Sequence, residues 1–383
     1  MNKPTVQDIF RCFYPAYLEK YSPSPEQAKV ARNILNCKTG AYGANVSVCE
    51  DCGAVQIHYN SCCNRCCPMC QAVPKEMWMD ARREDVLDAP YFHLVFTVPD
   101  ILNPIIYNNQ KLLYDTLYHA ASATISELTA DPKHLGADVG YICILHTWGS
   151  EMNFHPHIHT ILLGGGLTSK NEWKDNGTEF FLPIRAVSKS FRGKYIDELK
   201  HLWNTGQLEF HGTAEKYRNY YVFKDLLDSC YDTEWIPYCK KTFNGAGSVI
   251  DYLGKYTHRI AISNHRIICM DDENVTFSVK DYRNKGQWKE LTLSGVEFIR
   301  RFLMHVPPKR FVRIRHYGLL CSRSKHKKLA LCRNLLGCQK YLSKLRGKEM
   351  PEILKQLYEI NICVCKSCGG HLGKPQLRKP QRC

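Results

Sequence analysis

The sequence predicts a mixed fold of helices and antiparallel strands that follows a small metal-binding module. Three observations support this prediction. Residues 90–299 alternate apolar, β-branched segments with segments of helical periodicity. Two of the strand segments are joined by a loop of only five residues, 149–153. Residues 1–88 hold nine cysteines, among them the CxxC pairs Cys49/Cys52 and Cys67/Cys70, which have the spacing of zinc ligands.

Four segments have the composition of strands, because each is apolar or β-branched and is bounded by turn residues. They are residues 91–98, 140–148, 157–163 and 265–270. Pro90 and Pro99 bracket the first segment, and the glycine run 164–166 is expected to end the third. The short loop between the second and third segments predicts an antiparallel pair.

Two longer segments predict helices, at residues 108–130 and 188–208. The first carries Leu112, Leu113, Leu117 and Ile125 at roughly helical spacing. No run of 18 or more apolar residues occurs, so no membrane span is predicted. The N-terminus lacks a basic region followed by an apolar one, and we expect a cytoplasmic, nucleoid-associated protein.

The positive charge is concentrated in the last part of the chain. The net charge is +15, and residues 300–383 contain 21 Lys/Arg but 3 Asp/Glu. A basic block on a nearly neutral body favours a polyanionic partner, of which nucleic acid is the commonest. The alternative is a solvated tail. The expected DNA-contacting residues are Arg259, Arg313, Arg315, Lys325, Lys327 and Lys328.

The N-terminal cysteines predict zinc sites. A CxxC turn presents two sulfurs to one ion, and Cys49, Cys52, Cys67 and Cys70 form two such turns. The remaining cysteines of this region offer ligands for a second site, with His58 nearby, and its ligand set stays open: Cys37, Cys62, Cys63 and Cys66. A site closed by four sulfurs has no position for a substrate, so its role would be structural.

A further zinc site is expected near the C-terminus. Cys365 and Cys368 form a CxxC pair, which His371 or Cys383 would complete.

A histidine-rich strand predicts a catalytic metal. On a strand, residues two apart share a face, so His157 and His159 point the same way. The preceding strand brings His146 toward the same place, and His155 and Glu151 are alternative third ligands. Three ligands leave positions open for substrate oxygens. The alternative interpretation is a set of core histidines, although several buried imidazoles without partners would be costly.

A tyrosine pair predicts a nucleophile. Tyr252 and Tyr256 are four residues apart, which on a helix places both phenols on one face, and Lys255 lies beside them. Aromatic residues at this spacing are more often part of a core. Next to a metal and a cation, however, a phenol is a competent nucleophile toward a phosphodiester.

The motifs together resemble the HUH-type, two-tyrosine rolling-circle transposases of the IS91 kind. In this family HUH denotes His, hydrophobic residue, His. The resemblance is carried by the segments 61–71, His93-Leu-Val-Phe-Thr-Val-Pro99, His146-Thr-Trp-Gly149, Phe154-His-Pro-His-Ile-His159, 180–185, 252–266 and 314–320. It implies an α+β fold: an HUH endonuclease core with a central antiparallel sheet of five strands and helices against one face. The chain divides by composition into three regions, which are then expected to be a zinc-binding module (1–88), a catalytic domain (89–299) and a basic DNA-binding region (300–383) with a possible small zinc knuckle.

The resemblance also implies the chemistry. His157 and His159 match the HUH pair, and Tyr252 and Tyr256 match the two nucleophiles. The spacing in related conjugative relaxases favours His146 as the third ligand. The implied substrate is single-stranded DNA of transposon ends and target, the catalytic ion Mg²⁺ or Mn²⁺, and the structural ion Zn²⁺, with a helicase supplied by the host. Three alternatives remain: a plasmid replication initiator or relaxase with the same chemistry, a non-catalytic zinc-finger DNA-binding protein, and a metal-dependent hydrolase that uses water.

Overall fold

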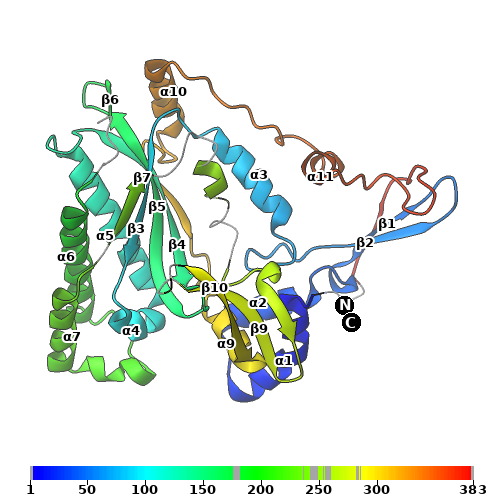
Figure 1. Cartoon of the computed structure of the whole chain (residues 1–383), viewed down its shortest axis with the longest axis horizontal. Coiled ribbons are helices and arrows are strands. Elements are labelled where there is room, and N and C mark those ends of the chain that lie inside the picture. Colours follow the sequence, from blue (N-terminus) through cyan, green and yellow to red (C-terminus); the bar gives the residue numbers. More distant parts are fainter. Residues whose placement is uncertain are drawn as a thin grey trace.

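The fold is built on a central antiparallel sheet. The computed structural model describes residues 3–175, 182–235, 237–241, 249–252, 254, 260–281, 284 and 286–380. Five strands lie in the order β11-β4-β5-β3-β7, and β6 pairs with β5 as a sixth (Figure 1). Their bounds are β3 Tyr91–Thr97, β4 Asp138–Trp148, β5 Phe154–Leu167, β6 Trp173–Asp175, β7 Tyr238–Lys241 and β11 Ile314–Gly318.

The strand β5, which carries the His-hydrophobic-His motif, lies in the middle of this sheet between β4 and β3. It extends through the glycine run to Leu167, beyond the end expected from the sequence. A Cβ at Gly164 would lie 2.8 Å from the Phe92 ring, so the missing side chain lets the neighbouring strand approach. The glycines therefore allow close packing of the neighbouring strand, and they do not end β5.

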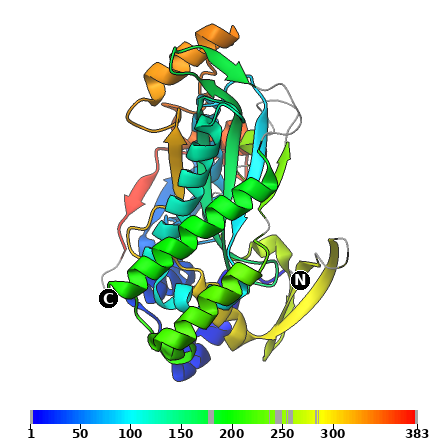
Figure 2. The same ribbon diagram turned by 90° about the vertical axis from the view of Figure 1, so that its left-hand side faces the viewer.

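Helices cover one face of the sheet. In Figure 2 the helices α6 and α7 lie in front of the strands, with α5 beside them. Alternate strand residues such as Leu94, Phe96 and Ile158 point into this layer and are fully buried. The helices of this side are α4 Asn103–Asn108, α5 Gln110–Ala130, α6 Ile184–Asn204 and α7 Tyr220–Asp232, with the 3₁₀ turns Asp100–Leu102 and Gly212–Arg218. The burial of their apolar faces stabilises the core.

The opposite face of the sheet is covered only in part. Met79 of α3 (Ala72–Arg83), the helical residues 249–252 and Leu329 of α10 (Lys325–Leu336) share a buried cluster with Ile142 and Ile161 of the sheet. A Cβ at Gly254 would lie 2.1 Å from the sulfur of Met79, so this segment lies directly against α3. The packing places Tyr252 next to the sheet.

A second body contains the N-terminal helices. The helices α1 (Val6–Lys20) and α2 (Pro25–Asn36) pack against α9 (Gly295–Met304) and share one apolar core with the sheet β10-β9-β8. That sheet comprises β8 Ile267–Met270, β9 Asn274–Asp281 and β10 Gln287–Ser294, after the 3₁₀ turn Asn264–Arg266. Both N-terminal helices begin with a capping box, Thr5 with Asp8 and Ser24 with Gln27, which fixes their starts.

A third, small sheet joins the two ends of the chain. Its order is β12-β1-β2, with β1 Ala44–Val48, β2 Val55–Tyr59 and β12 Gln376–Arg378. The 3₁₀ turn Gly40–Tyr42 precedes it, and α11 (Met350–Tyr358) leads the chain back to it. In Figure 1 this sheet lies at the end of the molecule away from α5 and α6.

The predicted α+β class with antiparallel sheets is confirmed. The expected boundary at 299/300 falls inside α9, and β11 from the supposed C-terminal region pairs with β4 in the central sheet. The basic region is thus not a separate unit, because part of it completes the central sheet. No helix among the described residues is long and apolar enough to cross a membrane.

Candidate active site and metal centres

Three histidines lie together on the less covered face of the central sheet. The register places His146 of β4 directly opposite His157 of β5, and His159 follows two residues later on the same face. Their ligand nitrogens all lie within 4.8 Å of one another. The sequence predicts this group for two reasons. Side chains two residues apart on a strand share a face, and the short hairpin loop places β4 beside β5.

The nitrogen geometry fits a shared metal ion. The Nε2 atoms of His157 and His159 are 3.1 Å apart. Two ligands at 2.0–2.1 Å from one ion would be about 2.9 Å apart in an octahedron and about 3.4 Å apart in a tetrahedron. The observed separation lies between these values. Neutral imidazoles are donors that first-row transition metals accept readily.

Hydrogen bonds outside the triad fix one ligand's tautomer. The Nδ1 of His157 lies 2.7 Å from the carbonyl oxygen of His155 and must donate to it, which leaves the Nε2 lone pair for a metal. The ring of His146 stacks on Trp148 with centroids 4.6 Å apart. Both contacts restrict ring rotation and so preorganise the site.

Burial keeps His157 and His159 neutral. Desolvation lowers the pKa of His157 to about 4 and holds the pKa of His159 well below its usual range. The pKa of His93, on the neighbouring strand, is lowered to about 4 for the same reason. Neutral imidazole is the form that binds metals, so the site is ready to bind an ion at neutral pH.

The two alternative third ligands lie elsewhere. His155 turns its Nδ1 toward the carboxylate of Asp100, 3.3 Å away. Glu151 lies in the β4–β5 loop and pairs with Lys289 at 3.3 Å. Neither belongs to the group of nitrogens within 4.8 Å, so His146 is the third ligand that the geometry favours.

A fourth histidine, which sequence reasoning did not select, connects the triad to a tyrosine. The Nε2 of His93 lies 2.9 Å from Nδ1 of His159. The phenol oxygen of Tyr252 lies 3.1 Å from Nδ1 and 2.7 Å from Nε2 of the same ring. Strand alternation could have identified His93. Val95 pairs with His159, and His93 lies two residues from Val95, so all three side chains are on the same face of the sheet.

Three predicted residues of the tyrosine helix, Lys255, Tyr256 and Arg259, lie outside the described residues. Tyr252 itself is half-buried and packs in the cluster that contains Met79 and Ile161. The structure therefore brings one of the two predicted nucleophiles to the histidines.

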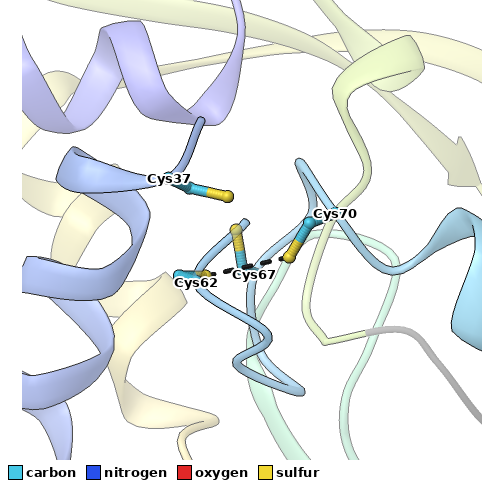
Figure 3. Close-up of side chains that lie close together, drawn as sticks. All are labelled: Cys37, Cys62, Cys67 and Cys70. Atoms are coloured by element: carbon cyan, nitrogen blue, oxygen red, sulfur yellow. Dashed lines mark hydrogen bonds between the residues drawn. The ribbon is translucent and has the colours of Figure 1, made fainter. Parts of the chain in front are cut away.

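A four-cysteine group lies where the N-terminal helices meet the loop before α3. Cys37 follows the last residue of α2, whereas Cys62, Cys67 and Cys70 come from that loop, and all four sulfurs point toward one another (Figure 3). The sulfurs of Cys62 and Cys70 are 3.8 Å apart. Zn–S bonds of about 2.3 Å give a tetrahedron with edges of about 3.8 Å, so the group fits a structural zinc.

The predicted pairing of the two N-terminal CxxC motifs is wrong. Cys67 and Cys70 lie with Cys37 and Cys62, whereas Cys49 and Cys52 lie with Cys365 and Cys368 near the other end of the chain. The reason is the sheet pairing of β1 with β12, which carries the first CxxC motif away from the second. His58 and His371 belong to neither sulfur group, and Cys383 lies outside the described residues.

Two further predicted ligands, Cys63 and Cys66, are not in a metal group. Cys63 is exposed and has a positive φ of 51°, with its thiol near the carbonyl of Ser61. Cys66 is buried, and burial raises the pKa of its thiol. Its electrostatic neighbours are Arg313 and Arg65, which lower that pKa. Neither thiol therefore belongs to the four-cysteine group that contains Cys62, Cys67 and Cys70.

Most of the predicted DNA-contacting cations have structural partners. Arg313 is 8% exposed and lies over the Trp148 ring, so it is not a surface residue. Arg315 pairs with Asp115 and lies over the Tyr118 ring. The remaining pairs are Lys325 with Asp85 at 2.9 Å and Lys328 with Asp138 at 2.6 Å.

Lys327 has no carboxylate partner within the part of the chain that the structure describes, and it lines a cavity of about 720 Å³ between α10 and the β5–β6 turn. This cavity includes Asp138, at the end of β4 opposite to His146, so it is remote from the triad.

Comparisons with known proteins agree on one family. Residues 9–98 match the family described as "Transposase zinc-binding domain", and residues 140–328 match the one described as "Putative transposase". A relative from Sinorhizobium fredii (strain NBRC 101917 / NGR234), "Putative transposase y4qJ", is 41% identical over 336 residues, which cover 87% of this chain and 84% of the relative. The "Transposase for insertion sequence element IS801" of Pseudomonas savastanoi pv. phaseolicola is 30% identical over 302 residues, 78% of this chain and 71% of the relative. No solved structure matches.

The two matched models describe a transposase and a transposase zinc-binding domain, so the protein is a transposase, and a transposase acts on DNA. The chain belongs to the IS91-like family of transposases. Its sequence is similar to that of the IS801 transposase. The resemblance inferred from the sequence motifs is thereby confirmed.

Proposed function

We propose that this transposase cuts and rejoins single-stranded DNA at the ends of its insertion sequence through a 5′-phosphotyrosine bond, in rolling-circle transposition. The observation that carries the proposal is the chain of contacts from the phenol of Tyr252 through His93 to His159. A phenol held this close to a histidine triad can attack a phosphate bound there.

The tautomers of the histidines favour a reactive phenol. When Nε2 of His159 binds a metal, its Nδ1 carries the proton and donates to Nε2 of His93. His93 then keeps its own proton on Nδ1, 3.1 Å from the Tyr252 oxygen, and donates to it. A donor at this oxygen stabilises the phenolate. In the alternative arrangement Tyr252 donates to Nε2 of His93 at 2.7 Å, which competes with His159 for that nitrogen.

His146, His157 and His159 would hold the ion, Mg²⁺ or Mn²⁺. When bound, the ion would supply positive charge near the scissile phosphate, whose negative charge increases in the transition state. Magnesium prefers oxygen ligands, whereas manganese also accepts imidazole. The three nitrogen donors therefore favour Mn²⁺.

The proposed reaction is a transesterification. The phenolate oxygen of Tyr252 forms a bond to phosphorus, the bond from phosphorus to the 3′ oxygen breaks, and that oxygen takes up a proton as a free 3′-hydroxyl. The bond energy stays in the phosphotyrosine, so rejoining needs no nucleotide cofactor. Tyr256, the second predicted nucleophile, would allow a second covalent step. The sequence contains no GxxxxGK[ST] motif, so we expect a host helicase to unwind the DNA.

A cavity beside the tyrosine helix is a candidate path for the strand. Its volume is about 360 Å³, and Gly254, Arg65, Lys75 and His265 are among the residues that line it. The cations would bind phosphates, and this contribution would weaken as the salt concentration rises.

The test is a covalent trapping assay. Labelled single-stranded DNA from the ends of the element is incubated with the protein and Mn²⁺, and adducts are separated on a denaturing gel. We expect adducts with wild type and with Tyr221→Phe, whose exposed side chain on α7 makes it a matched control. The double variant Tyr252→Phe, Tyr256→Phe should bind DNA without forming adducts, and His157→Ala should form none even with excess Mn²⁺.

The same assay separates the alternatives. A hydrolase would cut without an adduct and would not need either tyrosine. A zinc-finger protein with an inert core would neither cut nor form an adduct. A replication initiator or relaxase would form the adduct at a plasmid origin and not at the ends of an insertion sequence.

A further inference from the structure

We infer that Cys49, Cys52, Cys365 and Cys368 bind a second structural Zn²⁺ in a zinc ribbon that is split between the two ends of the chain. The matched zinc-binding domain ends at residue 98 and contains only half of these ligands. This inference is independent of the chemistry proposed for the histidine triad.

The sulfur separations indicate a metal site and not disulfides. The sulfurs of Cys49 and Cys368 are 3.5 Å apart, and those of Cys52 and Cys365 are 3.8 Å apart. A disulfide would require about 2.05 Å. Four thiolates at about 2.3 Å from one zinc would be about 3.8 Å apart, close to both values.

The two halves of the site have the same backbone conformation. The amide of Cys49 donates to the carbonyl of Ala54, five residues on, and the amide of Cys365 donates to Gly370, also five residues on. Each turn ends in a glycine with a left-handed backbone, Gly53 at φ 69° and Gly369 at φ 77°. The shared sequence is therefore CxxCG, and the glycine is needed because other residues rarely adopt this φ.

Backbone amides also point at the sulfurs of the C-terminal turn. The amide of Ser367 lies 3.4 Å from the sulfur of Cys365, and that of Gly370 lies 3.4 Å from the sulfur of Cys368. Such donors stabilise thiolates, which are the form that binds zinc.

Strand pairing holds the two turns face to face. Strand β12 pairs with β1, and the pairing continues as a bridge between Cys49 and Leu372. The amide of Glu50 donates to the carbonyl of His371, and the amide of Gly373 donates to Val48. Two such turns on a three-stranded antiparallel sheet form a complete ribbon, although its parts are separated by most of the sequence.

The apolar core of this module is too small to hold it together. Its buried cluster consists of Cys49, Cys365 and Leu372, with Ala54 packed against it. A module with so little buried apolar surface usually depends on a metal or disulfides for its stability. Zinc would therefore be what fastens the C-terminal segment to the N-terminal hairpin.

The zinc site would therefore link the C-terminal segment to the N-terminal hairpin. The C-terminal segment brings Lys366, Lys374, Arg378 and Lys379 to the β1–β2 hairpin, which itself has no Lys or Arg. Loss of zinc would release these cations from the hairpin while the central sheet keeps its own core.

The first test measures metal content. Reduced full-length protein is analysed for zinc as wild type, as Cys365→Ser with Cys368→Ser, and as the matched control Cys363→Ser, whose exposed thiol is outside the site. The double variant should lose one zinc per chain, and the control should lose none. In Co²⁺-substituted protein the thiolate charge-transfer absorption should fall by half in the double variant. Unchanged zinc content would overturn the inference.

The second test asks whether zinc joins the chain ends. Hydrogen exchange of the β1–β2 hairpin should accelerate by more than about tenfold in the double variant, although the substitutions lie far away in the sequence. Exchange in α5 should not change, which distinguishes local release from global unfolding. If the double variant does not fold, wild type is compared before and after chelation, with zinc returned to reverse the effect. Hairpin protection that survives complete zinc removal would overturn the proposal.

Discussion

The role of His93 can be tested by the substitution His93→Gln. The ring of His93 is 7% exposed and contacts both Nδ1 of His159 at 2.9 Å and the phenol of Tyr252. A glutamine keeps a polar side chain but has neither the ring shape nor the paired ring nitrogens. We expect it to weaken both hydrogen bonds without placing an unpaired charge in the site.

The magnitude follows from the two hydrogen bonds that His93 makes, one to His159 and one to Tyr252. Each hydrogen bond contributes about 1 kcal/mol net, so removing both costs about 2 kcal/mol, or a factor of about thirty. Residues that support metal ligands in this way typically change metal affinity or activity by about 10- to 100-fold. We therefore expect adduct formation to slow by about thirtyfold at a fixed, low Mn²⁺ concentration.

The assay divides this effect between its two causes. Metal affinity is measured by calorimetry, and the rate of adduct formation is measured at saturating Mn²⁺. If His93 acts through His159, the affinity falls and saturating metal restores the rate. If it acts through Tyr252, the rate stays low at saturating metal. His119→Gln, an exposed residue of α5, is the matched control.

Unchanged affinity together with an unchanged rate would refute the reasoning. It would mean that the hydrogen bonds between His93, His159 and Tyr252 have no part in the reaction.

The same geometry makes four further predictions. Burial lowers the pKa of His305 to about 4 from its ordinary value of 6.5, so between these two pH values the unfolded state takes up a proton that the folded state does not. Lowering the pH from 7 to 5 should therefore reduce the free energy of unfolding by about 2 kcal/mol more in wild type than in His305→Gln, as measured with denaturant. Cys62→Ser should remove one zinc per chain and lower the melting temperature, whereas Cys63→Ser should do neither. Mn²⁺ should support adduct formation at lower concentrations than Mg²⁺, and equal requirements would argue against three imidazole ligands. If α10 contacts DNA, Lys327→Ala should reduce the salt dependence of the DNA-binding constant. An unchanged salt dependence would exclude a contact between Lys327 and DNA.

The histidine triad was predictable because its pattern is local. Strand alternation places His157 and His159 on one face, and the five-residue loop brings β4 back beside β5 so that His146 pairs with His157. The antiparallel sheet follows from the same short connection. The predicted strands and helices differ from the observed ones at their ends, as where β5 continues through Gly164. The shorter strands, such as β7 and β11, were not among the predicted segments.

The zinc ligand sets were not predictable from spacing. Any two CxxC turns can close a zinc site, so the sequence does not say which pair meets which. The answer depends on the pairing of β1 with β12, which joins opposite ends of the chain. The match between Cys49-x2-Cys52-Gly53 and Cys365-x2-Cys368-Gly369 was present in the sequence, and it is the signal that could have identified the pair.

The charge count also gave an incomplete picture. It records cations but not their partners, and Arg315, Lys325 and Lys328 each pair with an aspartate from outside the basic region. Because β11 belongs to the central sheet, deletion of residues 300–383 would disrupt the core. Substitution of single charges is therefore the appropriate test of DNA binding.

The central claim is that a tyrosine beside the histidine triad becomes covalently linked to DNA. The most direct measurement is mass spectrometry of the peptide that remains attached to a nucleotide after the trapped adduct is digested with protease and nuclease. We expect a 5′-phosphate on Tyr252 or Tyr256, in a peptide that forms only when the metal is present. A nucleotide attached to a residue outside this helix, or cleaved DNA without any modified peptide, would contradict it.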